Sequence, residues 1–197
     1  RCGRPVAVTD ADGHVSRMVR DLAGRITALV APSGATSRYA WDACGRLARV
    51  KDASGRVARL VHDADGRLVR EERAAGASGW WSYDDCGRVT AAFTPGYGTV
   101  RYRYDPAGRV VRVSDPACGR RRLAYDQAGN LVKAVSGTGG VSWYDYDGCG
   151  RLVRVTGPTG AVTCYERDSL GQVVRLVDPA GRVTAAGYDG AGRQSWQ

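Results

Sequence analysis

Glycine recurs every 21 residues from one end of this chain to the other. The chain holds 27 glycines among 197 residues, and chance placement at that frequency would not align ten of them in one register. An uninterrupted period of this length indicates a repeat array, in which each unit is one small structural element. Because the signal is spread evenly, no position stands out as an active site. The periodic glycines are Gly3, Gly24, Gly45, Gly66, Gly87, Gly108, Gly129, Gly150, Gly171 and Gly192.

Other residue types follow the same period. The residue after each glycine is arginine in eight of the ten repeats, and Asn130 and Gln172 are the exceptions. From Gly24 onward an aspartate lies three residues before each glycine, and the residue before that aspartate is usually aromatic. The unit therefore reads Tyr-Asp-x-x-Gly-Arg-Leu. The aspartates are Asp21, Asp42, Asp63, Asp84, Asp105, Asp126, Asp147, Asp168 and Asp189.

The Asp-x-x-Gly spacing is typical of a tight turn. An aspartate at the first position accepts hydrogen bonds from the turn's own N–H groups, and a glycine at the fourth adopts positive φ without strain. We therefore expect a type I turn that closes into a bulge, and we interpret the nine aspartates and their glycines as structural turn residues. A second set of glycines, ten residues further on, predicts a turn at the other end of each repeat: Gly13, Gly34, Gly55, Gly76, Gly139, Gly160 and Gly181.

The residues between the turns form two runs of six and seven in each unit. Runs such as Arg151–Thr156 are rich in β-branched residues, and aromatic pairs such as Tyr144 and Tyr146 lie two apart, hence on one face of a strand. No stretch shows helical periodicity. We predict an all-β fold, a meander of about 18 antiparallel strands that curls as its twist accumulates. Leu152 is expected on one face, with Val153 and Val155 on the other.

We expect a single domain over residues 1–197 that contains about nine to ten repeats. No linker or charge run divides the chain. Regular arrays end in polar capping repeats, whereas this sequence starts and stops within a repeat, so we expect a segment of a longer shell.

The formal net charge is +9, and nearly all basic residues are arginine. Because the arginines recur beside aspartates, we favour ladders of neighbouring guanidinium and carboxylate groups at cross-strand distance. General affinity for polyanions is the alternative. A dedicated nucleic-acid site is not expected.

The six cysteines do not form a metal-binding or disulfide pattern. Cys2, Cys44, Cys86 and Cys149 share one turn position in repeats too far apart to be bridged directly, and Cys118 lies in no Cys-x-x-Cys spacing. The sixth is Cys164. We expect free thiols and no metal site.

Catalytic and cofactor-binding constellations are not predicted. His14 and His62 lie near no Ser or Cys nucleophile motif, and the repeated aspartates are too alike to serve as an acid and base pair. The glycines around Tyr97 lack the strand-to-helix context of a phosphate loop. Clustered aromatics are candidates for stacking on sugars, although core packing explains a repeated tyrosine more simply. They are Trp80, Trp81, Trp143 and Tyr144.

The repeated unit resembles the YD repeat of Rhs proteins. Tyr104–Val110 and Tyr146–Leu152 are representative copies, and the resemblance covers the whole chain. It implies a strip of β-hairpins coiled into a hollow shell, as in bacterial polymorphic toxins, insecticidal toxin complexes, wall-associated proteins and teneurins. In the toxins the shell encloses a C-terminal effector. The sequence contains no Rhs core with its self-cleaving aspartate and no toxin tip, so neither activity is assigned to any residue.

The resemblance implies a non-enzymatic segment of shell wall in a secreted or surface-displayed bacterial protein. Its expected partners are the remaining repeats and the effector of the same polypeptide. No membrane span and no cofactor are expected in this segment. The alternative is a repeat module that binds carbohydrate or a cell surface through its aromatic residues.

Overall fold

The computed structural model describes residues 6–73, 76, 78–190 and 192–196. Strands and tight turns make up this part of the chain, which contains no helix with the length and hydrophobicity that a membrane crossing requires. The chain divides into two units, Arg1–Thr99 and Val100–Gln197, which are treated separately below.

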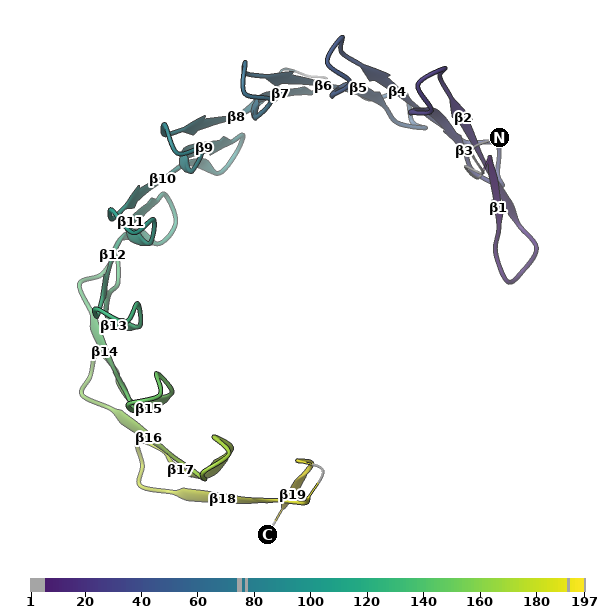
Figure 1. The fold of residues 1–197 in the computed structure, drawn as a ribbon. Helices are drawn as coiled ribbons and strands as arrows, with labels where there is room; N and C mark the ends of the chain where they lie inside the picture. The colour runs from purple at the N-terminus through teal and green to yellow at the C-terminus, as the bar shows by residue number, and fades with distance from the viewer. Residues whose placement is uncertain (1–5, 74–75, 77, 191, 197) are drawn as a thin grey trace. The chain divides into compact units, whose positions relative to one another are not determined.

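The first unit is an antiparallel meander in which each strand pairs with the next along the chain (Figure 1). Its strands are β1 (Ala7–Thr9), β2 (Val15–Arg20), β3 (Ile26–Val30), β4 (Thr36–Trp41), β5 (Leu47–Lys51), β6 (Val57–His62), β7 (Leu68–Arg73), β8 (Ser78–Tyr83) and β9 (Val89–Thr94).

The second unit repeats this pattern, again with every strand antiparallel to its neighbour in sequence. The predicted all-β meander is confirmed, with 19 strands in the described residues. The strands are β10 (Gly98–Tyr104), β11 (Val110–Asp115), β12 (Gly119–Tyr125), β13 (Leu131–Val135), β14 (Val141–Tyr146), β15 (Leu152–Thr156), β16 (Val162–Arg167), β17 (Val173–Val177), β18 (Val183–Tyr188) and β19 (Gln194–Trp196).

A β-bulge interrupts the strand pairing next to the Asp-x-x-Gly turns. In the β14–β15 hairpin, Asp145 pairs with Arg154 but Tyr146 pairs with Leu152, so Val153 has no partner across the ladder. The same shift occurs in the equivalent hairpins from β2–β3 to β16–β17. Each such hairpin therefore carries one extra residue on its second strand.

The bulge changes which side chains share a face, and the expected placement of Leu152 is wrong. Tyr144 pairs with Val155 and Tyr146 with Leu152, and directly opposed residues point to the same side of a sheet. Leu152 and Val155 therefore lie together on what we call the tyrosine face. Arg154 and its partner Asp145 lie on the opposite side, which we call the arginine face.

The sheet encloses little core of its own. Among the described residues only Ala91 and Val113 are buried, with 9% and 8% of their surface exposed. Most side chains of the tyrosine face are half-buried against neighbours in the same sheet. Contacts between successive repeats, rather than a central core, therefore hold each unit together.

Candidate functional site

The Asp-x-x-Gly turns form the recurring polar site of this chain, and Asp105 shows their chemistry. The Asp105 carbonyl accepts the Gly108 N–H at 2.9 Å, and the Asp105 N–H donates to the Arg109 carbonyl at 2.9 Å. Gly108 has a φ of +83°. A type I turn followed by a left-handed glycine is a three-residue hairpin loop that ends in a bulge.

The Asp105 side chain holds the arginine that follows the turn. Oδ1 accepts the Arg109 backbone N–H at 2.9 Å, and Oδ2 accepts Nε of the same residue at 2.8 Å. The backbone N–H of Arg109, followed by its guanidinium, lowers the pKa of Asp105 against the opposing effect of burial. The carboxylate is therefore ionised at neutral pH, and it fixes the direction in which Arg109 leaves the turn.

All nine sequence-predicted aspartates make the first of these bonds. Each accepts the backbone N–H of the residue four positions later at 2.8–2.9 Å. The nine periodic glycines that close these turns, from Gly24 to Gly192, have φ values between +75° and +95°. Gly3, the first of the periodic glycines, lies outside the described residues. The structure thus places the predicted turn residues in one repeated geometry.

The arginine held in one turn reaches the next repeat. Nη1 of Arg109 donates to the Asp126 carbonyl at 3.2 Å, and its Cζ lies 4.8 Å from the centre of the Tyr125 ring. Arg67 makes the same contacts with the Tyr83 ring, at 5.0 Å, and with the Asp84 carbonyl, at 3.4 Å. We call this set of contacts the repeat clasp: a guanidinium of one repeat against the aromatic ring and aspartate carbonyl of the next.

The aromatic residue that precedes the turn aspartate also satisfies a backbone acceptor. The Tyr146 hydroxyl donates to the Leu131 carbonyl at 2.9 Å. Pairing between β13 and β14 runs only from Lys133 to Val135, so Leu131 lies where the two strands separate. A buried carbonyl without a partner is costly, and the tyrosine supplies that partner from the next repeat.

Where another residue replaces the tyrosine, a different side-chain donor reaches the equivalent carbonyl. Trp41 uses its indole Nε1–H, which donates to the Ile26 carbonyl at 2.9 Å. Arg167 takes the place of a tyrosine, and its Nη2 donates to the Leu152 carbonyl at 3.2 Å. The shared requirement is therefore a long side chain with a donor at its tip.

The clasp gives the periodic glycines a second role that sequence reasoning missed. A Cβ built at Gly45 would lie 3.4 Å from Nη1 of Arg25, and one at Gly171 would lie 2.7 Å from Nη1 of Arg151. The arginine of one repeat thus lies over the glycine of the next turn. The one sequence signal for this contact is the constant spacing of 20 residues between a turn arginine and the next periodic glycine.

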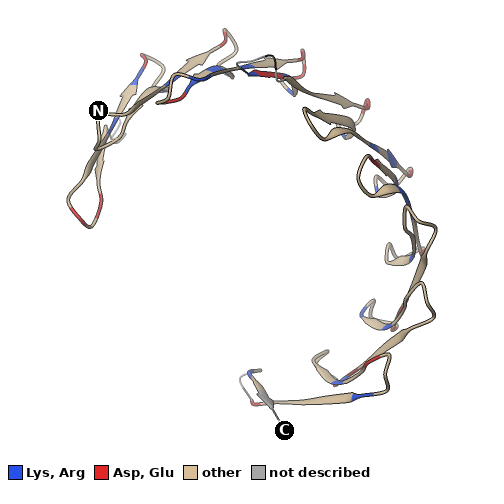
Figure 2. Ribbon diagram, turned by 180° about the vertical axis from the view of Figure 1, so that it is seen from behind, with Lys and Arg blue, Asp and Glu red and all other residues tan. Residues whose placement is uncertain are grey.

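The expected ladders of guanidinium and carboxylate groups are wrong for the turn arginines, which pair with an aspartate of their own turn. Strand arginines also meet arginines: Arg112 lies opposite both Arg103 and Arg122 in the pairing of β10 to β12. Figure 2 shows the acidic residues mostly at the turns and basic residues along the strands. The arginine face therefore contains rows of like charge.

The four candidate sugar-stacking aromatics do not share one surface. Trp80 and Trp81, like Trp143 and Tyr144, are neighbours in a strand and point to opposite faces. Trp80 stacks on Phe93 with ring centres 6.0 Å apart, and Nζ of Lys133 lies 4.4 Å from the centre of the Trp143 ring. Glycan binding stays a prediction, which a glycan array with a Trp143→Ala control would test.

The five described cysteines are free, and Cys164 is the least exposed of them. Cys2 lies outside the described residues. Within the described ranges one group of three potential metal ligands comes together, formed by Asp10, Asp12 and His14, and all three are exposed. The Asp10 carboxylate there caps its own turn by accepting the backbone N–H groups of Asp12 and His14. This group looks like an ordinary turn.

Comparisons with known proteins agree on the architecture. The crystal structure of TcdB2-TccC3 superposes with a TM-score of 0.77 and 18% identity over 98% of this chain and 12% of that chain. The same complex without its hypervariable C-terminal region gives a TM-score of 0.73 and 16% identity over 93% of this chain and 12% of that one. The Photorhabdus luminescens Tc holotoxin pore gives 0.62 and 15% over 94% and 13%.

This chain thus spans about an eighth of the length of those solved chains, with which it shares a fold. No curated protein sequence matches it. A family model described as Teneurin YD-shell matches residues 3–163 and 81–197, which together cover nearly the entire sequence. The chain belongs to the Teneurin YD-shell family.

Proposed function

We propose that this chain is a non-enzymatic segment of shell wall in a large secreted or surface-displayed bacterial protein of the Rhs type. The wall would enclose a C-terminal effector of the same polypeptide until delivery. Family membership and the likeness to TcdB2-TccC3 and to the Tc holotoxin pore support this proposal. The partners of the segment would be the repeats on either side of it and the enclosed effector.

The repeat clasp is the observation that carries the proposal. Arg109 leaves its own turn to contact Tyr125 and the Asp126 carbonyl of the next repeat. Each repeat therefore completes the hydrogen bonding of its neighbour, which is the requirement for a wall that can be extended unit by unit. The repeated Asp, Gly, Arg and Tyr residues are engaged in this structural task, which favours a wall over a catalyst.

The two faces of the sheet also suit a wall. The tyrosine face combines aromatic and aliphatic residues such as Tyr144 and Val155, whereas the arginine face carries Arg154 and Asp145. A wall presents one surface to the enclosed polypeptide and another to solvent. A sheet with two chemically different faces can suit both surroundings.

Limited proteolysis of the parent polypeptide tests the proposal. If the wall encloses an effector, residues beyond the repeats will resist a protease that digests the same residues expressed alone. Combining Arg67→Ala with Arg109→Ala should weaken two clasps and speed digestion of the enclosed part. Arg56→Ala is the matched control, because Arg56 is 80% exposed and its ion pair and side-chain hydrogen bond within the described residues go to Asp52 and Ser54 of its own turn. Equal digestion of the enclosed and isolated effector would contradict enclosure.

A further inference from the structure

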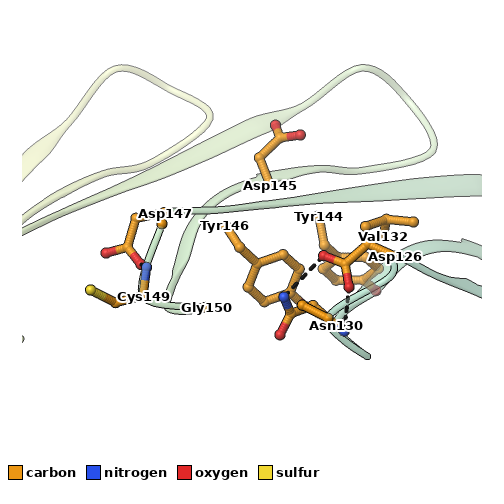
Figure 3. Close-up of a pocket in the computed structure, with 11 residues that line it drawn as sticks. Asp126, Asn130, Val132, Tyr144, Asp145, Tyr146, Asp147, Cys149 and Gly150 are labelled. Atoms are coloured by element: carbon orange, nitrogen blue, oxygen red, sulfur yellow. Dashed lines mark hydrogen bonds between the residues drawn. The ribbon is translucent and has the colours of Figure 1, made fainter.

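Two clasp positions in the second unit lack a guanidinium, because Asn130 and Gln172 replace the arginine. Asn130 occupies the position of the clasp arginine, and its backbone N–H and Nδ2 donate to Oδ1 and Oδ2 of Asp126 at 2.8 and 2.9 Å. These bonds reproduce the inner half of the usual arrangement, in which Arg109 uses its backbone N–H and Nε. Figure 3 shows the Asn130 amide held against Asp126, beside the Tyr146 ring.

The outer half of the clasp is left unfilled at this position. In the preceding repeat Arg109 contacts the Tyr125 ring and the Asp126 carbonyl. The equivalent ring and carbonyl belong to Tyr146 and Asp147, whereas the shorter Asn130 side chain makes its hydrogen bond to Asp126. Among the described residues no cation lies over Tyr146, and the Asp147 carbonyl accepts only the Gly150 N–H.

A cavity of about 760 Å³ opens where the arginine would lie. Tyr146, Asp126, Tyr144 and the turn that contains Asp147 and Gly150 line it (Figure 3). A Cβ at Gly150 would lie 3.5 Å from Oδ1 of Asn130, so the Asn130 amide lies over the turn glycine, where an arginine lies in other repeats. The volume is ample for one arginine side chain.

The lining of the cavity includes a carboxylate that forms no ion pair in the described part of the chain. Asp126 forms no ion pair with any described residue, whereas Asp105 and Asp147 are each paired with the arginine of their own turn. Hydrogen bonding from the Asn130 side chain lowers the pKa of Asp126, so its negative charge is present at neutral pH. Burial, together with nearby Tyr144 and Asp126, raises the pKa of Tyr146. Tyr146 is thus a neutral ring beside an uncompensated carboxylate.

We propose that this cavity binds a guanidinium group from outside the repeat, supplied by an arginine side chain of a bound polypeptide. The plane of the guanidinium would lie on Tyr146, one N–H would donate to the Asp147 carbonyl, and its charge would face Asp126. Arg109 in the preceding repeat and Arg67 in the first unit show this mode of binding with the chain's own arginines. A planar, forked cation fits the ring and the carbonyl together, whereas a lysine ammonium is a point charge that cannot contact both in this way.

NMR titration with N-acetylarginine amide tests the site, with N-acetyllysine amide as the competing cation. The chain is labelled isotopically at tyrosine, and the signal of the Tyr146 ring is identified by its disappearance in Tyr146→Phe. The expected result is a saturable change in the chemical shift of Tyr146 with the arginine probe. The lysine probe should bind about 2–5-fold more weakly. No saturable shift, or equal binding of both probes, would overturn the proposal.

Asn130→Arg provides a second readout that needs no ligand. The new arginine should occupy the cavity, abolish binding of the probe and raise the melting temperature, because it restores a clasp already present in other repeats. Gln172→Arg is the matched control, since Gln172 is the other departure from arginine and lies in a different repeat; it should leave binding at Tyr146 unchanged. An Asn130→Arg chain that melts lower than the parent would show that the cavity does not accept a guanidinium. One that still binds the probe at Tyr146 would show that the probe does not occupy the clasp position, and either result would overturn the proposal.

Discussion

The guanidinium of Arg109 lies 4.8 Å from the ring centre of Tyr125, 16 residues further along the chain. This contact joins two successive hairpins, and Nη1 strengthens it by donating to the carbonyl of Asp126. The arginine is only a third exposed, because the ring and the following turn cover it. The same side chain therefore closes its own turn through Asp105 and fastens the next one.

Removing this guanidinium should loosen one junction between repeats. Arg109→Ala is expected to lower the melting temperature by ~2–4 °C, because it removes a cation–π contact and a hydrogen bond to a backbone carbonyl. Arg109→Lys should recover only part of the loss. Differential scanning calorimetry measures the change, and Arg56→Ala, at an 80% exposed arginine, should melt like the parent chain. Equal melting of Arg109→Ala and Arg56→Ala would mean that the clasp adds no stability.

The local part of this arrangement could be predicted from the sequence, and the part between repeats could not. Asp105 and Gly108 lie in one four-residue turn whose hydrogen bonds depend only on local backbone geometry. The contact of Arg109 with Tyr125 depends on how neighbouring hairpins separate at their ends. Sequence alternation also misplaced Leu152, because the alternate residues were counted without the extra residue that the expected bulge adds. The cavity beside Tyr146 had a visible signal, since Asn130 breaks the arginine rule.

Gly137 should tolerate no side chain, for a reason unrelated to the turn geometry. A methyl group at this position would overlap the backbone carbonyl oxygen of Cys118 in the neighbouring turn. Gly137→Ala must therefore shift the backbone and is expected to destabilise the chain by about 1–3 kcal/mol. Gly148→Ala is the matched control, because nothing lies within 4 Å of a Cβ there. Urea unfolding compares the two, and similar midpoints would contradict the close approach of the two turns.

Electrostatic repulsion within the row formed by Arg103, Arg112 and Arg122 should lower the stability of the sheet. Arg112 lies opposite an arginine on both sides, and like charges directly opposed across a sheet are destabilising. Arg112→Glu would create two opposite-charge pairs and is expected to raise the melting temperature by ~1–3 °C at low salt. The gain should shrink at high salt, as screening weakens both the repulsion and the new pairs. A lower melting temperature for Arg112→Glu at low salt would show that this row is not repulsive.

Acid should weaken the turns through their aspartates, and Asp105 allows the effect to be isolated. Its pKa in the folded chain lies below the reference value of 3.8, chiefly because its carboxylate accepts the Arg109 N–H. A group whose pKa is lowered by folding stabilises the native state when it is ionised. That contribution is complete at pH values above the pKa of the unfolded chain, and it is lost as the pH falls through the folded pKa. Asp105→Asn keeps the shape and an accepting oxygen but removes the charge.

The difference in urea midpoint between the parent chain and Asp105→Asn should therefore be largest above about pH 5 and should shrink as the pH falls below 3.8. The comparison at each pH cancels the effect of the other aspartates, which titrate in both chains. Asp12→Asn serves as the control, because the Asp12 side chain is exposed and its backbone N–H is the group that takes part in the turn. A difference that stays constant from neutral to acidic pH would show that Asp105 stabilises the turn through shape alone and that its charge contributes nothing.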